Sequence, residues 1–144
     1  MKLPCRAKSA VLEQLTADAL IPVIRADSPE VALRVVEALV EGGITTLEIT
    51  MTVPDALTAI GSVAEKFGHS VLLGAGTVTT GAMAEGALDA GAEFLVTPCL
   101  VPEVIEVAKR NGVAVLPGAI TPTEVFTAWS LGGDIIKIFP ASHV

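Results

Sequence analysis

The chain has 144 residues and a formal net charge of -7, which is enough length for one domain with a single hydrophobic core. Hydrophobic residues make up 51% of it and aromatic residues only 3%, a mixture that suits small-residue helices packed against a parallel sheet. The negative charge disfavours nucleic acid and anionic membrane surfaces as partners. We expect no transmembrane segment and no signal peptide, because no apolar run reaches roughly 18 residues and the N-terminus lacks a cleavage pattern.

Strand patterns alternate with helical patterns along the chain, after a helix expected around residues 9–19. The expected strands are Ile21–Ile24, Ile44–Thr50, Val71–Gly74, Glu93–Thr97, Val113–Leu116 and Asp134–Phe139. The expected helices are Pro29–Glu41, Pro54–Phe67, Gly81–Ala90, Pro102–Asn111 and Pro122–Leu131. Strands begin about every 20 to 27 residues, the pace of successive βα units. Proline opens four of these helices, and Thr121 with Glu124 predicts a capping box.

Six βα-type strands are compatible with two architectures, an open doubly wound sheet or a (β/α)₈ barrel without its last two units. Length favours the open sheet, because a barrel typically needs about 200 to 250 residues. The positions of polar residues favour the barrel, because they fall at successive strand ends: Arg25, Glu48, Thr50, Thr77, Thr97 and Lys137. We therefore predict an α/β fold of the TIM (β/α)₈-barrel type, truncated after the sixth strand, as a single partial domain over residues 1–144.

Lys137 stands in the last apolar run, Asp134–Phe139, which Pro140 closes and which predicts a buried strand. A desolvated lysine is a nucleophile for carbonyl carbon and forms Schiff bases. A lysine that reaches solvent, or one paired with a carboxylate, is the structural alternative. Strand alternation places Ile135, Lys137 and Phe139 on one side, and it turns Glu48 toward the barrel interior.

Five short motifs, each at an expected strand end, resemble the 2-keto-3-deoxy-6-phosphogluconate (KDPG) aldolase family. They are Leu47-Glu48-Ile49-Thr50, Gly74-Ala75-Gly76-Thr77-Val78, Val96-Thr97-Pro98, Leu116-Pro117-Gly118 and Lys137-Ile138-Phe139-Pro140-Ala141. The resemblance extends from about Ala19 to the last residue. It implies a class I aldolase on a TIM barrel, typically a homotrimer, that uses no metal or other cofactor. The implied reaction cleaves KDPG, or a related 2-keto acid such as 4-hydroxy-2-oxoglutarate, to pyruvate and an aldehyde (glyceraldehyde 3-phosphate from KDPG).

The resemblance also assigns roles to individual residues. Lys137 matches the lysine that forms the imine with the pyruvyl carbonyl, and Glu48 matches the acid-base carboxylate. Thr77 and Pro98 match positions that line the pyruvyl pocket, and Phe139 covers the same inward side. Independently of the resemblance, imine chemistry needs a nearby base to handle several protons.

The sequence departs from the family at Thr52, a position where many members carry an arginine that binds anionic substrate groups. Arg25 is the alternative cation for the substrate carboxylate or phosphate. The purely structural interpretations are that Arg25 bonds Asp27 or caps its loop, and that Glu48 is a carboxylate paired with Lys137 or Arg25.

The second departure is at the end of the chain, where the family continues through two further βα units that help bind the substrate phosphate. Their absence leaves the first and sixth strands with unpaired edges. We expect that the chain is a fragment, that another subunit supplies the missing surface, or that the protein is a degenerate remnant. A non-catalytic structural or assembly module is the alternative function, and a phosphosugar barrel in which Lys137 acts only as a charge is another.

The remaining conspicuous residues receive structural interpretations. Gly74-Ala75-Gly76 is interpreted as a tight strand end rather than a phosphate-binding loop. Trp129 is expected in the core or in a subunit contact. The distant Cys5 and Cys99 indicate a reducing, cytoplasmic setting, with Cys99 beside the pocket, while His69 and His143 are expected on the surface.

Overall fold

The structure is a computed structural model that describes residues 6–143, and its centre is a parallel sheet in the order β1-β2-β3-β4-β5. The bounds are β1 Val23–Ile24, β2 Thr46–Thr50, β3 Leu72–Gly76, β4 Phe94–Val96 and β5 Ala114–Leu116. After Pro117 the fifth strand resumes as β6 (Gly118–Ala119), which pairs in parallel with β7 (Lys137–Ile138). The strands follow chain order without the reversal that defines a doubly wound sheet, so that alternative is wrong.

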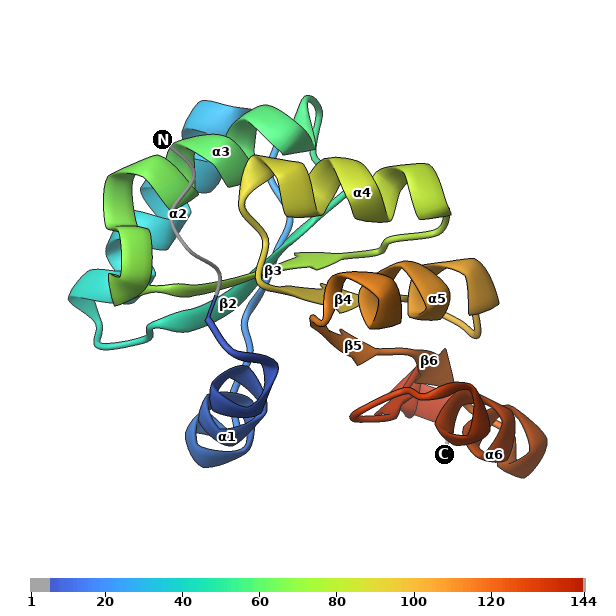
Figure 1. Ribbon diagram of the computed structural model, residues 1–144. Coiled ribbons are helices and arrows are strands. Elements are labelled where there is room, and N and C mark those ends of the chain that lie inside the picture. Colours follow the sequence, from blue (N-terminus) through green and yellow to red (C-terminus); the bar gives the residue numbers. More distant parts are fainter. Residues whose placement is uncertain (1–5, 144) are drawn as a thin grey trace.

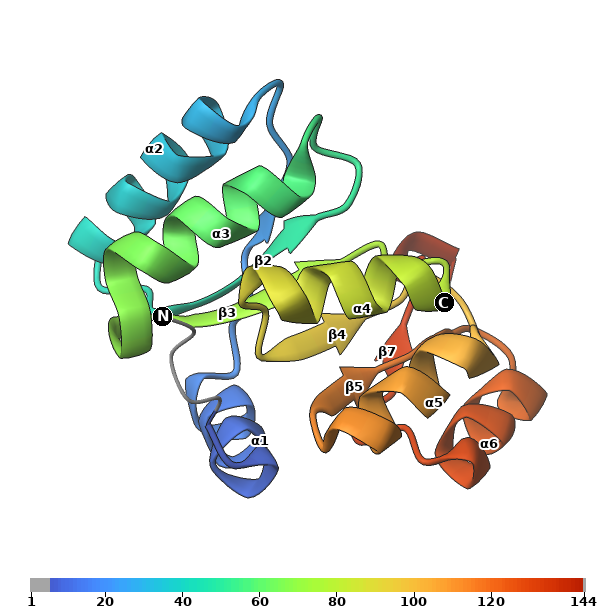
Figure 2. The same ribbon diagram turned by 45° about the horizontal axis from the view of Figure 1, so that its top comes forward.

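The helices are divided between the two faces of this sheet (Figures 1 and 2). They are α1 Lys8–Asp18, α2 Pro29–Glu41, α3 Ala56–Phe67, α4 Gly81–Ala90, α5 Pro102–Asn111 and α6 Pro122–Leu131, with 3₁₀ turns η1 Gly68–Ser70 and η2 Ala141–His143. Helices α2 to α5 lie side by side over one face, whereas α1 lies on the opposite face. None of the described helices combines the length and apolar character required to cross a bilayer.

The helix predictions from sequence are confirmed for α2, α4, α5 and α6, whose bounds agree with the expected ranges. The predicted capping box is also confirmed, because the Thr121 side chain accepts from the Glu124 N–H while the Glu124 carboxylate accepts from the Thr121 N–H. Helix α3 starts two residues later than expected, since Asp55 takes a left-handed backbone conformation with φ of 49° and leaves Pro54 outside the helix.

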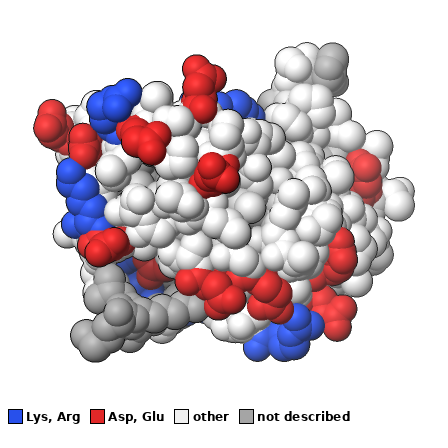
Figure 3. Space-filling view, turned by 90° about the horizontal axis from the view of Figure 1, so that it is seen from above, with Lys and Arg blue, Asp and Glu red and all other residues white. Residues whose placement is uncertain are grey.

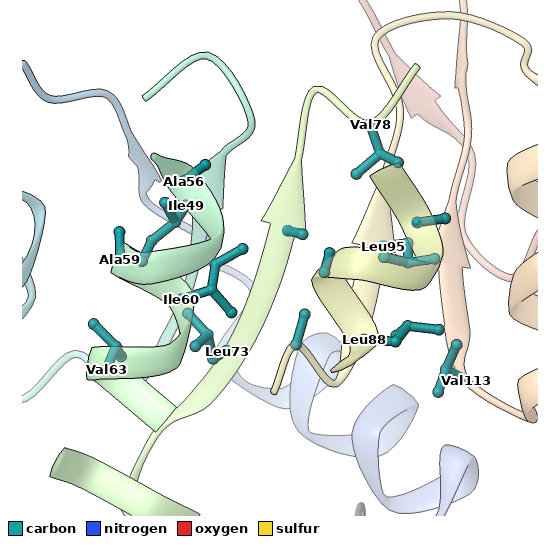
Figure 4. Packing of buried hydrophobic residues seen from close by; sticks show 14 of the residues in the cluster. Ile49, Ala56, Ala59, Ile60, Val63, Leu73, Val78, Leu88, Leu95 and Val113 are labelled. Atoms are coloured by element: carbon teal, nitrogen blue, oxygen red, sulfur yellow. The ribbon is translucent and has the colours of Figure 1, made fainter. Parts of the chain in front are cut away.

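The larger hydrophobic core lies between the outer face of the sheet and helices α2 to α5 (Figure 4). Alternate strand residues, among them Ile49, Leu73 and Leu95, point into this layer. They meet Ile60 and Leu88 from the facing helices. Small residues fill much of the remaining interface, which lets the helices approach the sheet closely.

A second core fills part of the inner face of the sheet, where α1 covers it. Val11 and Leu15 of α1 pack with Phe94 and with other inward-facing strand residues. The Thr46 hydroxyl, which faces the same side, donates to the Asp18 carboxylate at 2.5 Å. Helix α1 therefore closes the inner face near the amino ends of the strands, and the carboxyl ends are left for a site.

The charged side chains on the helix-covered side are mixed in sign (Figure 3). Basic groups lie toward the left, the top and the lower edge of this view with acidic groups among them, acidic groups alone lie toward the right, and a broad uncharged area separates these groups. Two ion pairs join neighbouring helices, Glu37 with Lys66 and Glu85 with Arg110. All four side chains are substantially exposed, so each pair adds at most about 1 kcal/mol.

Trp129 is not in the core, which corrects one of the two interpretations offered above. Its side chain is 65% exposed and lies with Phe126, 73% exposed, on the outer side of α6. Only Ala128 of α6 is fully buried, because the helix contacts α5 and β6 on one side alone. The subunit-contact interpretation of Trp129 stays a prediction.

Candidate active site

Glu48 lies in the middle of β2, on the inner face of the sheet, and is 2% exposed. Its carboxylate atom Oε1 accepts no hydrogen bond from any described residue. Burial raises the pKa of the Glu48 carboxyl above its ordinary value, and the positive charges of Lys137 and Arg25 offset part of this rise. The site therefore contains a carboxyl group that holds its proton more strongly than a surface glutamate.

Lys137 begins β7 and approaches Glu48, with 3.7 Å between its Nζ and Oε1. The same Nζ lies 5.2 Å from the centre of the Phe139 ring, as alternation along the strand predicts. The expected buried strand is wrong in extent: regular pairing covers only Lys137–Ile138, and the Lys137 side chain is 28% exposed. β7 has a hydrogen-bonded neighbour on one side only among the described strands, so it is partly open to water.

The Lys137–Glu48 contact shows that the sheet is strongly curved. Strands β3, β4 and β5–β6 lie between β2 and β7 in the strand order. Neighbouring strands are about 4.8 Å apart, so four such steps separate the two by about 19 Å in a flat sheet. That span exceeds the combined reach of a lysine and a glutamate side chain. Curvature of the sheet brings the two groups together.

Thr77 follows β3 directly and has an unusual backbone conformation. Its φ of 56° lies in the left-handed region, which β-branched residues rarely adopt. The next residue continues toward the neighbouring strand, where the Val78 N–H donates to the Val96 carbonyl at 3.1 Å. Such strain persists only where surrounding structure enforces it, and it is concentrated at functional sites.

Pro98 follows β4 in a loop held tightly against β6. The Thr97 hydroxyl donates to the Cys99 carbonyl at 2.5 Å and accepts from the Gly118 N–H at 3.1 Å. A Cβ at Gly118 would stand 2.4 Å from the Pro98 carbonyl carbon, so this close approach requires glycine. Gly118 pairs with Lys137, and Pro98 is thereby placed one strand away from the lysine.

Arg25 and Thr52 lie at the strand ends beyond Glu48, and both are exposed. The Thr52 hydroxyl hydrogen-bonds that of Thr50 at 2.8 Å, and Thr50 in turn donates to the Ile24 carbonyl. No ion pair joins Arg25 to Asp27 within the described residues, so the structure does not show the predicted bond to Asp27, while the loop-capping interpretation stays a prediction. Arg25 acts on the site through its charge, which favours ionised Glu48.

Of the seven predicted site residues, Lys137, Glu48 and Phe139 are in direct proximity. The other four lie at the carboxyl ends of β1 to β4. Thr97 was named from the sequence among the polar strand-end residues but was given no role in the site, although the residue is fully buried and organises the Pro98 loop. A polar residue at the end of an apolar strand was the available signal.

Of the remaining residues, Cys99 is free and exposed, His69 is exposed, and Cys5 and the His143 side chain lie outside the described part.

This arrangement suits reactions of carbonyl compounds. A primary amine faces a buried carboxyl group with a raised pKa, at one end of a curved sheet. An amine of this kind can attack a carbonyl carbon, and a carboxyl group beside it can exchange protons with the resulting oxygen and nitrogen.

Comparison with known proteins assigns the family. A family model described as KDPG and KHG aldolase matches residues 11–144. The chain belongs to this aldolase family. It is 40% identical over 123 residues to a probable 2-dehydro-3-deoxy-6-phosphogalactonate aldolase of Rhizobium meliloti, an alignment that covers 85% of this chain and 58% of the relative. A 2-dehydro-3-deoxy-phosphogluconate aldolase of Treponema pallidum is 37% identical, with 91% of this chain and 62% of the relative covered.

Solved aldolase structures share the fold. The KDPG aldolase of Legionella pneumophila, crystallised with pyruvate captured as a covalent carbinolamine, superposes with a TM-score of 0.84 at 32% identity. The superposition covers 96% of this chain and 65% of that one. The chain thus spans about three-fifths of the length of the curated relatives it matches.

Proposed function

We propose that this chain carries the catalytic pair of a class I aldolase that cleaves KDPG or a related 2-keto acid to pyruvate and an aldehyde. One observation carries the proposal: the Lys137 amine lies 3.7 Å from the buried Glu48 carboxylate. Membership of the aldolase family supports the same chemistry.

The proposed reaction divides the work between these two side chains. The Lys137 nitrogen attacks the keto carbon, and Glu48, directly or through water, delivers a proton to the carbonyl oxygen. A second proton, lost by the attacking amine and relayed by Glu48, lets that oxygen leave as water as the protonated imine forms. The carbon–carbon bond next to the 4-hydroxyl then breaks as that hydroxyl gives its proton to the Glu48 carboxylate and becomes the carbonyl of the released aldehyde. The electron pair of the broken bond flows into the protonated imine and forms an enamine. Reprotonation of carbon and hydrolysis release pyruvate and free lysine.

Substrate contacts are assigned from the strand ends around this pair. Thr77, Pro98 and Phe139 are proposed to surround the pyruvyl part, because they follow β3, β4 and Lys137 respectively. Arg25 and Thr52, which lie farther out, are proposed to meet the anionic remainder of the substrate. The exposure of Arg25 and its freedom from ion pairs with described residues support that role.

The larger assembly is also proposed. The curved parallel sheet supports a TIM-type barrel wall of which this chain supplies six strands. We propose a homo-oligomer, a trimer by family resemblance, which sedimentation at two or more concentrations tests through the fitted mass. The free, exposed thiol of Cys99 supports a cytoplasmic location, where thiols stay reduced.

Borohydride trapping with pyruvate tests the proposed function. We expect intact mass and peptide mapping to show one reduced pyruvyl adduct, on Lys137, and Lys137→Ala to abolish it. Lys66→Ala is the matched control, because Lys66 is an exposed lysine on α3 far from β7 in sequence, and it should retain the adduct. A folded wild-type chain without an adduct would contradict the proposal and favour a non-catalytic module. Turnover of a sugar phosphate without an imine would instead favour the phosphosugar alternative.

A further inference from the structure

Strand β3 presents two glycines, Gly74 and Gly76, to the inner face of the sheet. Neither has a positive φ, whereas five other described glycines do. Their role is therefore not to provide backbone freedom, and β3 continues as regular strand through Gly76. The absence of a side chain at each position makes space, and the neighbouring strands show what occupies it.

The space over Gly74 is filled by Phe94. A Cβ at Gly74 would stand 2.2 Å from two atoms of the Phe94 ring, and that side chain is fully buried. Gly74 pairs with Phe94 on one side and with Glu48 on the other. The Phe94 ring therefore lies over β3, the strand next to that of Glu48, in the inner core that α1 covers.

The space over Gly76 is filled by the carboxyl group of Glu48. A Cβ at Gly76 would stand 2.5 Å from Oε1 and 2.8 Å from Cδ of Glu48, distances too short for atoms that are not bonded. The strand is fixed at this point, because the Met51 N–H donates to the Gly76 carbonyl at 2.8 Å. The carboxylate, rather than the backbone, would have to move if residue 76 had a side chain.

We propose that Gly76 is a positioning residue for Glu48, because the missing side chain at this position holds open the space in which the carboxylate faces Lys137. Oε1 accepts no hydrogen bond from a described residue, so packing and the charge of Lys137 determine where it lies. The inference rests on the proposed function, since it concerns the placement of the proposed acid-base group. It also gives the glycine-rich end of β3 a role that neither the tight-strand-end nor the phosphate-loop interpretation included.

Four proteins test the inference: the wild type, Gly76→Ala, Glu48→Ala and the double variant. In the wild-type background we expect Gly76→Ala to slow pyruvate-adduct formation about 10²-fold, since a small misplacement of a catalytic group costs about that much. The acidic limb of the pH–rate profile should move as well. In the Glu48→Ala background the added methyl group enters vacated space, so Gly76→Ala should change the rate less than twofold and leave the unfolding temperature unchanged or higher.

Gly61→Ala in α3 is the matched control, because an added Cβ there meets nothing closer than 3.9 Å. It should leave adduct formation at the wild-type rate. Equal effects of Gly76→Ala in both backgrounds, or a wild-type rate and pH profile in Gly76→Ala, would overturn the positioning role. Loss of folding in Gly76→Ala that persists when Glu48 is alanine would also overturn it. Failure of the proposed function is distinguishable, because the wild type itself would then form no adduct.

Discussion

Glu48 combines two properties that oppose each other in a folded protein. Its carboxylate is buried, which favours the protonated form, and it faces Lys137 and Arg25, which favour the ionised form. Burial is the larger effect, and the pKa is raised above the ordinary value of 4.5. A carboxyl group with a raised pKa exchanges protons more readily near neutral pH, the property that imine chemistry requires.

The raised pKa of Glu48 predicts a pH dependence of stability. The folded state holds the Glu48 proton more tightly than the unfolded state, so stability is lost as pH rises from 4.5 through the folded pKa. Glu48→Gln cannot ionise and does not suffer this loss. The unfolding temperature of the variant relative to the wild type should therefore increase with pH above 4.5 and be constant below it.

Glu124→Gln provides a control of opposite sign for the same thermal scans. Hydrogen bonds from the Thr121 and Ile120 N–H groups lower the pKa of Glu124, so its contribution to stability is present above the ordinary carboxyl value and lost in acid. The unfolding temperature of Glu124→Gln relative to the wild type should therefore decrease as pH rises. Parallel pH trends for the two variants would contradict the assignment of a raised pKa to Glu48.

At the scale of elements, the helix ends were predictable because capping depends on residues close in sequence. Proline at Pro29, Pro102 and Pro122 opens α2, α5 and α6 at the predicted residue. Strand ends were less predictable, because a strand is defined by its neighbours. β7 shows this most clearly: its apolar pattern covers six residues, but regular pairing covers two.

The capping box of α6 predicts a measurable contribution to stability. Thr121→Ala removes the side-chain acceptor for the Glu124 N–H and should lower the free energy of unfolding by about 1 kcal/mol. Urea unfolding followed by circular dichroism measures this difference. Thr123→Ala, at an exposed position two residues farther along, should stay within about 0.5 kcal/mol of the wild type. Equal losses in the two variants would show that the box does not stabilise the helix.

At the scale of the whole molecule, two hydrophobic cores, one on each face, stabilise the curved sheet. Helices α2 to α5 cover its outer face, while α1 alone covers the described inner face near the amino ends of the strands. This division leaves the carboxyl ends of the strands to Glu48, Lys137 and the loops around them. The curvature that joins these two residues is thus a property of the sheet as a unit.

The closure of the inner face by α1 predicts that Leu15 contributes strongly to stability. Leu15 is 3% exposed and packs among inward-facing strand residues, so Leu15→Ala should cost about 2 to 5 kcal/mol of unfolding free energy. Leu20→Ala, at a leucine that is 59% exposed, is the matched control and should have a small effect. A similar, small loss for both in chemical denaturation would mean that α1 does not seal this core.

Most of the helices and the contact between Lys137 and Glu48, the proposed catalytic pair, could be predicted from sequence. Lys137 and Glu48 are each a charged residue within an apolar strand pattern, and this local pattern indicates a functional role for each. The surroundings of Trp129 could not be predicted in this way, because its aromatic character indicates burial without saying against which surface. The close contacts at Gly76 and Gly118 were also hidden, since the atoms that would meet a side chain there belong to Glu48 on a neighbouring strand and to the Pro98 loop.

The sequence by itself determined the order of the βα units, the inward direction of Glu48 and Lys137, and the family resemblance, because these depend on periodicity and short motifs. Only the tertiary structure decided that the sheet follows chain order and curves until Lys137 and Glu48 are 3.7 Å apart. It also decided how strongly each group is desolvated. The physical reason is that strand order, curvature and burial arise from contacts between residues far apart in the chain, and no local pattern encodes those contacts.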